Sequence, residues 1–441
     1  MVVQHNMQAA NANRMLNVTT SAQSKSTEKL SSGYRINRAA DDAAGLTISE
    51  KMRKQIKGLD RASTNAEDGV SAVQTAEGAL TEVHSMLQRM NELATQSANG
   101  TNSNTDRKAI QDEIDQLTTE IDRVSETTKF NETYLLKGDG AEKAHNVNAH
   151  DAGLDGVTLT DKGDTVDVTL KTLNAGDKVS IAGKNYTIGA TAADAQKIVD
   201  AQKVDGKTVT VNGTTYTYKT NQWTNADGSA ATVGGGAAGS ITIKGGDVVS
   251  DGTKTLTAMK DGADAAGADG IDDNDSTVIT AGKAYQLQTA EIVKASSIGT
   301  DTAAAVKNGA NADKDATATF TLNKGTVSYK DALSFNLHVG ADADMTNKIT
   351  VNIDSMNSAG LGVKGIKADT EQDATYAIDA IADAISTVSS QRSSLGAVQN
   401  RLEHTINNLD NVVENTTSAE SRIRDTDMAE EMVNYSKNNI L

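Results

Sequence analysis

Histidines and carboxylates are the side chains of this sequence that could support catalysis or metal binding. The six histidines are scattered, and no H-E-x-x-H pattern sets two of them on one helix face around a zinc ion. His145 and His150 could share a zinc ion only if the fold brought carboxylates to them. We therefore interpret the histidines as solvent-exposed and predict no metal site.

Two further patterns resemble ligand sites without meeting their requirements. The acidic run from Asp269 to Asp275 lacks the alternating ligands and the closing Glu of an EF-hand, so we predict a solvated loop. Gly234, Gly236 and Gly239 match G-x-G-x-x-G, but a strand-like segment follows them where a nucleotide site needs a helix. We predict no bound cofactor.

The sequence also excludes several classes of function. No nucleophile, base and orienting group stand out together, so we predict no catalytic residues and no enzyme. There is no Cys, which excludes disulfides and thiolate sites. The net charge of -17 opposes binding to nucleic acid or to an anionic membrane surface. No run of about 18 apolar residues is present, so we expect no membrane insertion.

A long stripe of apolar residues lies near the C-terminal end of the chain. Over residues 378–416, large apolar residues recur at helical spacings, and Pro is absent from the whole chain. A stripe sustained this far predicts a coiled coil, which needs partner helices. The predicted core positions of this seam include Ile385, Leu395, Leu402 and Leu409.

The N-terminal part supplies two partner seams. One runs over residues 73–94 and includes Leu80 and Leu87, and the other runs over residues 110–124 and includes Ile114, Leu117 and Ile121. A turn separates them, with Thr105 as the expected N-cap of the second helix. The two ends of the chain are therefore predicted to close one antiparallel helical bundle.

The composition changes near residue 140, where Gly, Thr and Asp become frequent. Short runs of period two, such as residues 165–170 and 208–211, predict strands, and Asn212-Gly213 is a strong hairpin signal. The predicted fold class is α+β: a long antiparallel helical bundle or coiled coil formed by both chain ends, with one or two β-rich domains inserted in the middle.

Several motifs in the helical ends resemble those of bacterial flagellins. They lie at residues 34–45, 75–80, 87–94, 394–401 and 421–429, and the resemblance covers about residues 1–140 and 332–441. It implies three parts. Residues 1–45 and 417–441 would form inner-core helices and a connector, residues 46–140 and 332–416 an outer-core bundle with a β-hairpin, and residues 141–331 a variable, surface-exposed insert.

The resemblance also implies a life cycle. The chain would be exported without a cleaved signal peptide by the flagellar type III apparatus, aided by a chaperone. It would then assemble with copies of itself, under a filament cap and above junction proteins, into the extracellular filament. Family members usually continue past the position of Leu441 with further helical turns. Either such turns follow in this protein too, or the subunit assembles with an incomplete inner core.

A host partner is implied as well. The family's contacts with the Toll-like receptor for flagellin fall on Gln88, Arg89, Leu93 and Glu113 of this sequence. Arg89 and Glu113 would anchor the receptor through polar contacts, with Leu93 as an apolar contact. Each of these residues could equally lie between subunits of the filament.

Two other functions remain open from the sequence. A hook-filament junction protein would share the terminal helices but occur in few copies, and the motifs at residues 87–94 and 395–401 disfavour it. The middle of the chain could instead carry a ligand-binding or hydrolytic domain. Deletion of about residues 145–330 would separate a scaffold, which should still polymerise, from an adhesin or an enzyme.

Overall fold

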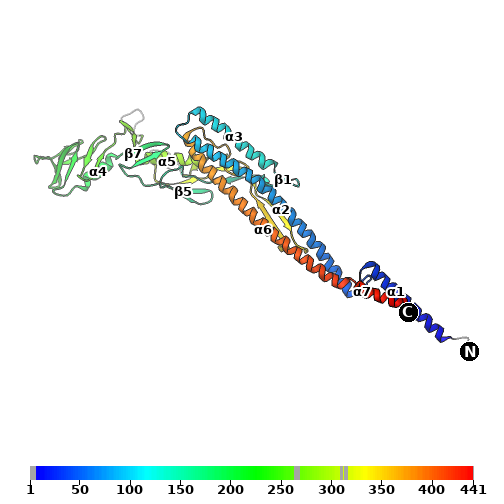
Figure 1. The fold of residues 1–441 in the computed structure, drawn as a ribbon. Helices are drawn as coiled ribbons and strands as arrows, with labels where there is room; N and C mark the ends of the chain where they lie inside the picture. The colour runs from blue at the N-terminus through cyan, green and yellow to red at the C-terminus, as the bar shows by residue number, and fades with distance from the viewer. Residues whose placement is uncertain (1–5, 263–268, 308–310, 312–315, 441) are drawn as a thin grey trace. The chain divides into compact units, whose positions relative to one another are not determined.

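The computed structural model describes residues 6–262, 269–307, 311 and 316–440 (Figure 1). The chain forms two compact units, each assembled from segments far apart in the sequence. Unit 1 comprises Met1–Gly78, Ser334–Ile353 and Arg392–Leu441, and unit 2 comprises Ala79–Leu333 and Asp354–Gln391. The α+β class expected from the sequence is confirmed, because long helices come from both ends of the chain and the strands come mainly from its middle.

Five helices are formed by the two ends of the chain: α1 (Met7–Ser32), α2 (Ala43–Ser97), α3 (Asn104–Thr127), α6 (Glu371–Arg424) and α7 (Met428–Ile440). Gly33 ends α1 with φ 76°, a left-handed conformation that glycine adopts without strain. The N-cap of α3 is Ser103, which exchanges hydrogen bonds with Asp106 in a capping box, so the expectation of Thr105 as the cap is wrong.

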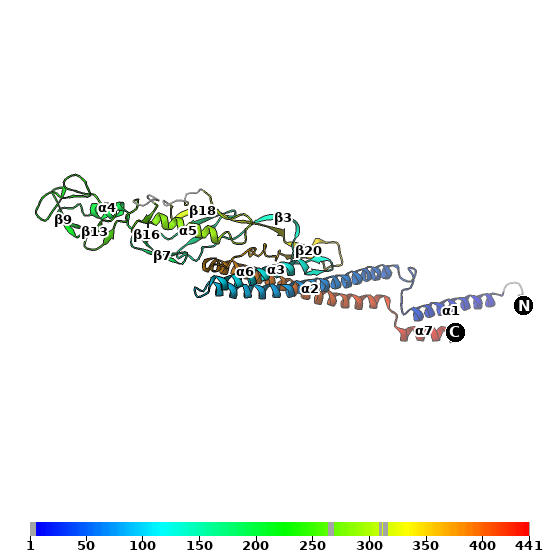
Figure 2. The same ribbon diagram turned by 90° about the horizontal axis from the view of Figure 1, so that it is seen from above.

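In unit 1, α2 and α6 run antiparallel and side by side (Figures 1 and 2). Polar contacts fix their register: Arg53 with Glu420 at 3.4 Å, Ser63 with Asp410 at 3.1 Å and Arg392 with Glu77 at 3.5 Å. A hairpin of β20 (Leu333–His338) and β21 (Lys348–Ile353), joined through the short 3-10 helix η1 (Met345–Asn347), packs against both helices. Their shared core contains Ala66, Val339, Ile349 and Leu402.

The nine predicted seam residues are divided between the two units. Leu80, Leu87, Ile114 and Ile121 in unit 2 and Leu395, Leu402 and Leu409 in unit 1 are buried. Leu117 and Ile385, both in unit 2, are only half-buried. Positions three or four residues from them, Ile114, Ile121, Ile381 and Val388, are fully buried, so Leu117 and Ile385 lie at the edge of the apolar stripe.

Unit 2 buries a segment without regular secondary structure against its helices. Residues 354–368 lie between β21 and α6, and Met356, Val363 and Ile366 within them are at most 1% exposed. The buried Gln111 side chain of α3 donates to the Ile366 carbonyl and accepts from the Ala368 amide. An irregular segment can be buried only where its backbone polar groups find such partners.

Next to the helices, unit 2 contains a four-stranded sheet in the order β17-β18-β5-β4. Helix α5 (Ala281–Ala295) covers it, and Tyr285 and Ile292 of α5 share a core with Phe320 and with Tyr376 of α6. The strands of this region are β3 (Asp139–Asn146), β4 (Thr158–Asp161), β5 (Thr165–Thr169), β17 (Ala305–Val306), β18 (Thr319–Asn323) and β19 (Thr326–Asp331), with β3 paired to β19 and a separate hairpin of β1 (Lys129–Phe130) and β2 (Thr133–Tyr134).

A second sheet in unit 2 has the order β15-β16-β7-β6 and its own small core of Ile181, Ile188, Ile279 and Ala284. Adjacent strands of this sheet are antiparallel, except that β7 and β16 are parallel. The strands are β6 (Lys178–Ile181), β7 (Lys184–Ile188), β15 (Ile271–Asp272) and β16 (Asp275–Ile279).

Residues 191–258 make an excursion from this second sheet and return to it. Ala190 and Ala258 form a bridge, and the Met259 amide donates to the Ala190 carbonyl at 2.8 Å. Trp223, 1% exposed, lies in a core drawn entirely from this excursion. Its elements are α4 (Ala192–Ala201), β8 (Thr208–Val211), β9 (Thr214–Lys219), β10 (Gln222–Thr224), β11 (Thr232–Val233), β12 (Ser240–Ile241), β13 (Val248–Ser250) and β14 (Thr255–Thr257).

Candidate interaction surfaces

The two histidines considered for zinc are half-buried in unit 2, so the expectation that they are solvent-exposed is wrong. The His145 ring stacks on Tyr329 with centroids 4.0 Å apart, and its Nε2 lies 3.3 Å from Asp331. The His150 amide donates to Ser296 Oγ at 3.0 Å. Within the described part of the chain, no three His, Cys, Asp or Glu residues gather as a metal would need.

The acidic run uses its carboxylates to hold its own turns. Asp272 accepts from the amides of Asn274 and Asp275, and Asp275 accepts from the amide and hydroxyl of Thr277. The side-chain hydroxyl and the amide of Thr277 hold the pKa of Asp275 below its usual value. The glycine motif sits between β11 and β12, two strands that pair in parallel, and precedes a strand.

A polar ridge, formed by Gln88, Arg89, Glu92 and Glu113, lies on the outer face of α2 and α3 in unit 2. Arg89 Nε donates to Glu113 at 2.9 Å, and its Nη1 lies 3.2 Å from Glu92. The Arg89 and Glu113 side chains are 49% and 45% exposed, and the hydrogen bond to Glu113 raises the pKa of Arg89. A hydrogen-bonded pair this exposed contributes little to folding and remains available to a partner.

Leu93 differs from the expectation of an apolar contact beside this ridge. Its side chain is 2% exposed, because it points into the helical core together with Met90 and Ala94. The side chain of Leu93 therefore offers no surface to a partner, while Gln88, Arg89 and Glu113 are exposed.

Helices α1 and α7 form an antiparallel pair in unit 1 (Figures 1 and 2). Lys29 lies 3.6 Å from Glu431, and Gln23 donates to Asn439 at 3.2 Å, so the second half of α1 is the part that contacts α7. Large apolar side chains on both helices are nevertheless exposed by 49–86%: Met7, Met15, Leu16 and Val18 on α1, and Met428, Met432, Val433 and Ile440 on α7.

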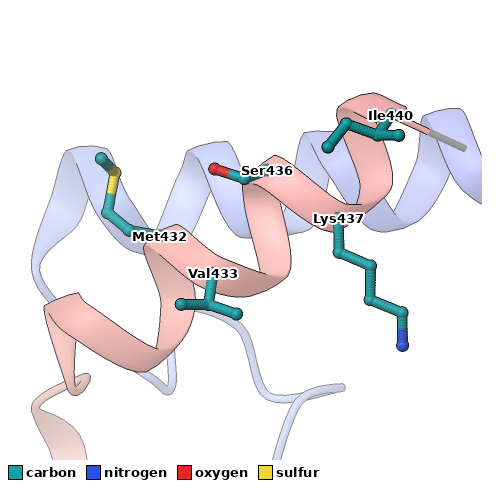
Figure 3. Close-up of a pocket in the computed structure, with 5 residues that line it drawn as sticks. All are labelled: Met432, Val433, Ser436, Lys437 and Ile440. Carbon is teal, nitrogen blue, oxygen red and sulfur yellow. The ribbon is translucent and has the colours of Figure 1, made fainter.

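A hollow on α7 is part of this surface. Figure 3 shows Met432, Val433 and Ile440 lining it with Ser436 and Lys437, beside the translucent α1. Eight of the fourteen exposed large hydrophobic residues in the described chain lie on α1 and α7, which have 26 and 13 residues. Such a concentration marks an interaction surface, whereas single exposed apolar residues are ordinary.

The connectors leading to α1 and α7 pair with each other. The Arg35 amide donates to the Arg424 carbonyl at 2.7 Å, and the Thr426 amide donates to the Gly33 carbonyl at 3.0 Å. Arg424 also forms an ion pair with Glu50 at 2.6 Å. The two terminal helices are thus joined to α2 and α6 through one shared set of contacts within unit 1.

These features define a class of protein: a helical structural subunit with an inserted β-rich region and an apolar surface on its terminal helices. No helix among the described residues has both the length and the apolar character needed to cross a bilayer.

Comparison with known proteins gives the family. The model of the bacterial flagellin N-terminal helical region matches residues 3–141, and that of the C-terminal helical region matches residues 378–441. A flagellin of Clostridium tyrobutyricum is 41% identical over all of this chain and 96% of its own length. Flagellin C of Vibrio cholerae is 35% identical, covering all of this chain and 93% of its own length. FliC from Burkholderia pseudomallei is a distant structural neighbour, with 17% identity, a TM-score of 0.29, and coverage of 76% of this chain and 99% of its own.

The chain belongs to the bacterial flagellin family, and it is a structural subunit of the flagellar filament. This confirms the resemblance seen in its helical motifs.

Proposed function

We propose that the chain assembles with other copies of itself through α1 and α7. The observation that carries the proposal is the cluster of eight exposed apolar side chains on these two helices. Burying one side chain of this size stabilises an interface by roughly 1.5–3 kcal/mol. Assembly would bury the largest newly covered surface on the first half of α1, because residues 7–18 are all exposed.

Assembly is tested by electron microscopy and sedimentation of the purified full chain. We expect the native chain to form filaments and Leu16→Asp or Val433→Asp to prevent them, since a carboxylate would be buried at the contact. Val204→Asp is the matched control, because Val204 is also exposed, at 57%, but lies beyond α4 in the excursion. A native chain that stays monomeric, or a control as defective as the other two variants, would contradict the proposal.

We propose a position for the chain in the flagellum in which each part takes the place that the family resemblance implies. Residues 1–45 and 417–441 would form the inner core, residues 46–140 and 332–416 the outer core, and residues 141–331 the outward-facing insert. Export without a cleaved signal peptide, by the type III apparatus and a chaperone, would deliver the subunit beneath the cap. Junction proteins would connect the filament to the structure below it.

The monomer is further proposed as a ligand of the Toll-like receptor for flagellin through the polar ridge. Its exposed ion pair presents a guanidinium and carboxylates at fixed positions, which suits a polar interface. Leu93 is left out of this surface because it is buried.

A receptor reporter assay with monomeric protein tests the ridge. Arg89→Asp places a negative charge beside Glu92 and Glu113, so we expect signalling to be lost while the helical content is unchanged. Arg123→Asp is the matched control, because Arg123 forms a similar exposed pair with Glu120 on α3. An unchanged response with Arg89→Asp, or equal losses with both variants, would remove the ridge from the receptor site.

A further inference from the structure

Most methionines of the described chain are either buried or exposed, whereas Met52 and Met86 are half-buried. Met90 and Met356 are 0% exposed and Met259 is 6% exposed, all of them in hydrophobic cores of unit 2. By contrast, Met7 and Met15 on α1 are 78% and 57% exposed, and Met428 and Met432 on α7 are 49% and 54% exposed. Among the remaining methionines, Met345 in the turn between β20 and β21 is also exposed, at 75%.

The four exposed methionines of α1 and α7 belong to the surface on which self-assembly is proposed. Met428 and Met432 are four residues apart and so lie on one side of α7. Figure 3 shows Met432 in the hollow with Val433 and Ile440. Oxidation changes a thioether from a flexible apolar group into a polar, chiral one, and its rate depends on access to the sulfur.

We propose that Met7, Met15, Met428 and Met432 form an oxidation-sensitive site that controls assembly. The oxidant is a hydroperoxide. Its O–O bond breaks, one oxygen bonds to the methionine sulfur, and the other leaves as water when the oxidant is hydrogen peroxide. The sulfur is oxidised from thioether to sulfoxide and the peroxide is reduced, so no further reactant is needed.

The site would act on the free subunit before it assembles. In the monomer the four sulfurs are accessible, whereas the core methionines are shielded by packing. Sulfoxides on α1 and α7 would put polar groups where assembly requires apolar contact, and methionine sulfoxide reductases could restore the thioethers. This consequence rests on the proposed assembly through α1 and α7.

The first experiment treats purified monomer with hydrogen peroxide and maps the oxidised residues by mass spectrometry of peptides. We expect Met7, Met15, Met428, Met432 and Met345 to be oxidised at least tenfold faster than Met90, Met259 and Met356, because packing limits access to the core sulfurs. Equal rates in the two groups would overturn the assignment of the site.

The second experiment measures assembly of the same samples by sedimentation. We expect oxidation to raise the concentration required for assembly by about tenfold or more, because each sulfoxide removes an apolar contact. Treatment with reductases specific for both sulfoxide epimers should restore it. A variant with all four residues changed to Leu, which has a similar volume, should assemble and resist peroxide, while Met345→Leu should remain sensitive.

The outcomes separate this inference from the proposed function. If untreated native chain fails to assemble, the proposed function fails. If it assembles and the oxidised chain assembles equally well, only the oxidation-sensitive site is overturned. Loss of assembly that the reductases do not reverse would also count against the site, because sulfoxide formation would not be its cause.

Discussion

The guanidinium of Arg424 lies over the ring of Tyr34, 4.9 Å from its centroid, and joins the end of α6 to the connector that follows α1. Arg53 of α2 approaches the same ring at 6.0 Å. Tyr34 also pairs with Asp425 in an isolated bridge. One aromatic ring in unit 1 therefore links the segments that lead into both terminal helices.

Removing the Arg424 side chain should loosen this link. Arg424→Ala loses a cation–π contact, worth about 0.5–2 kcal/mol, and the ion pair with Glu50. We expect the amides of Arg35 and Thr426 to exchange with solvent about tenfold faster, measured by hydrogen exchange. Tyr34→Phe keeps the ring and should leave exchange unchanged, and an equal effect of both variants would speak against the cation–π contact.

Gln111 should be one of the most sensitive polar positions of unit 2. Gln111→Ala leaves the Ile366 carbonyl and the Ala368 amide buried without their side-chain partner, at a cost of about 1–3 kcal/mol in the free energy of unfolding. Gln116→Ala is the control, because Gln116 is exposed on the same helix. Thermal unfolding followed by circular dichroism measures both, and similar midpoints would refute the prediction.

Two glycines of α2 should respond to alanine in opposite directions. A Cβ on Gly78 would meet no atom within 4 Å, so Gly78→Ala should stabilise the helix by about 0.5–1 kcal/mol. A Cβ on Gly69 would lie 2.2 Å from Leu337 Cδ1, so Gly69→Ala must shift the Leu337 side chain, which packs against the core of unit 1, and should destabilise unit 1. Thermal unfolding of the two variants provides the comparison. A shift in the same direction for both would contradict it.

Asp251 should make the turn between β13 and β14 sensitive to acid. The Lys254 and Thr253 amides and the Thr253 hydroxyl donate to its carboxylate and lower its pKa to about 2, from an ordinary value of 3.8. Because the folded pKa is the lower one, this stabilisation is complete above about pH 4 and is lost as the pH falls towards 2.

Unfolding can be followed by the fluorescence of Trp223, which lies in the same sheet as this turn. Because Trp223 is the only Trp in the sequence, the signal is specific to this region. The difference in midpoint between the native chain and Asp251→Ala should be largest above pH 4 and should shrink as the pH falls to 2. Asp251→Asn keeps a neutral acceptor and should show no such pH dependence. A difference that is constant from pH 5 to pH 2 would exclude the ionised carboxylate as its cause.

The parts of the fold that could be predicted are those specified by local periodicity. Apolar residues at spacings of three and four identified α2, α3 and α6, and Asn212-Gly213 identified the turn between β8 and β9. Helix α5 was not predicted. It contains two Gln, one Gly, one Thr and few large apolar residues, so its composition resembles that of the β-rich region around it. Its helical state depends on the packing of Tyr285 and Ile292 against a sheet.

The site was harder to predict because exposure is a property of the packed chain. Leu93 lies four residues after Arg89 in one motif, a spacing that predicts the same side of α2 for both. In the folded chain, however, Leu93 is 2% exposed and the Arg89 side chain is 49% exposed. Likewise, residues 354–368 show no periodicity, and their burial depends on distant side chains such as Gln111. The sequence indicates that α1 and α7 are weakly amphipathic helices. It does not show that their exposed apolar residues form a shared surface.

The bridge between Ala190 and Ala258 has a consequence for how this protein can diverge. The chain leaves the sheet at Ala190 and returns to it next to that residue, at Ala258. Because Trp223 and its core partners all lie within residues 191–258, we expect this segment to be replaceable as a whole. Another sequence that closes the same short gap could replace it without redirecting β7 or β16. We therefore expect that substitutions within residues 191–258 leave the remainder of unit 2 folded.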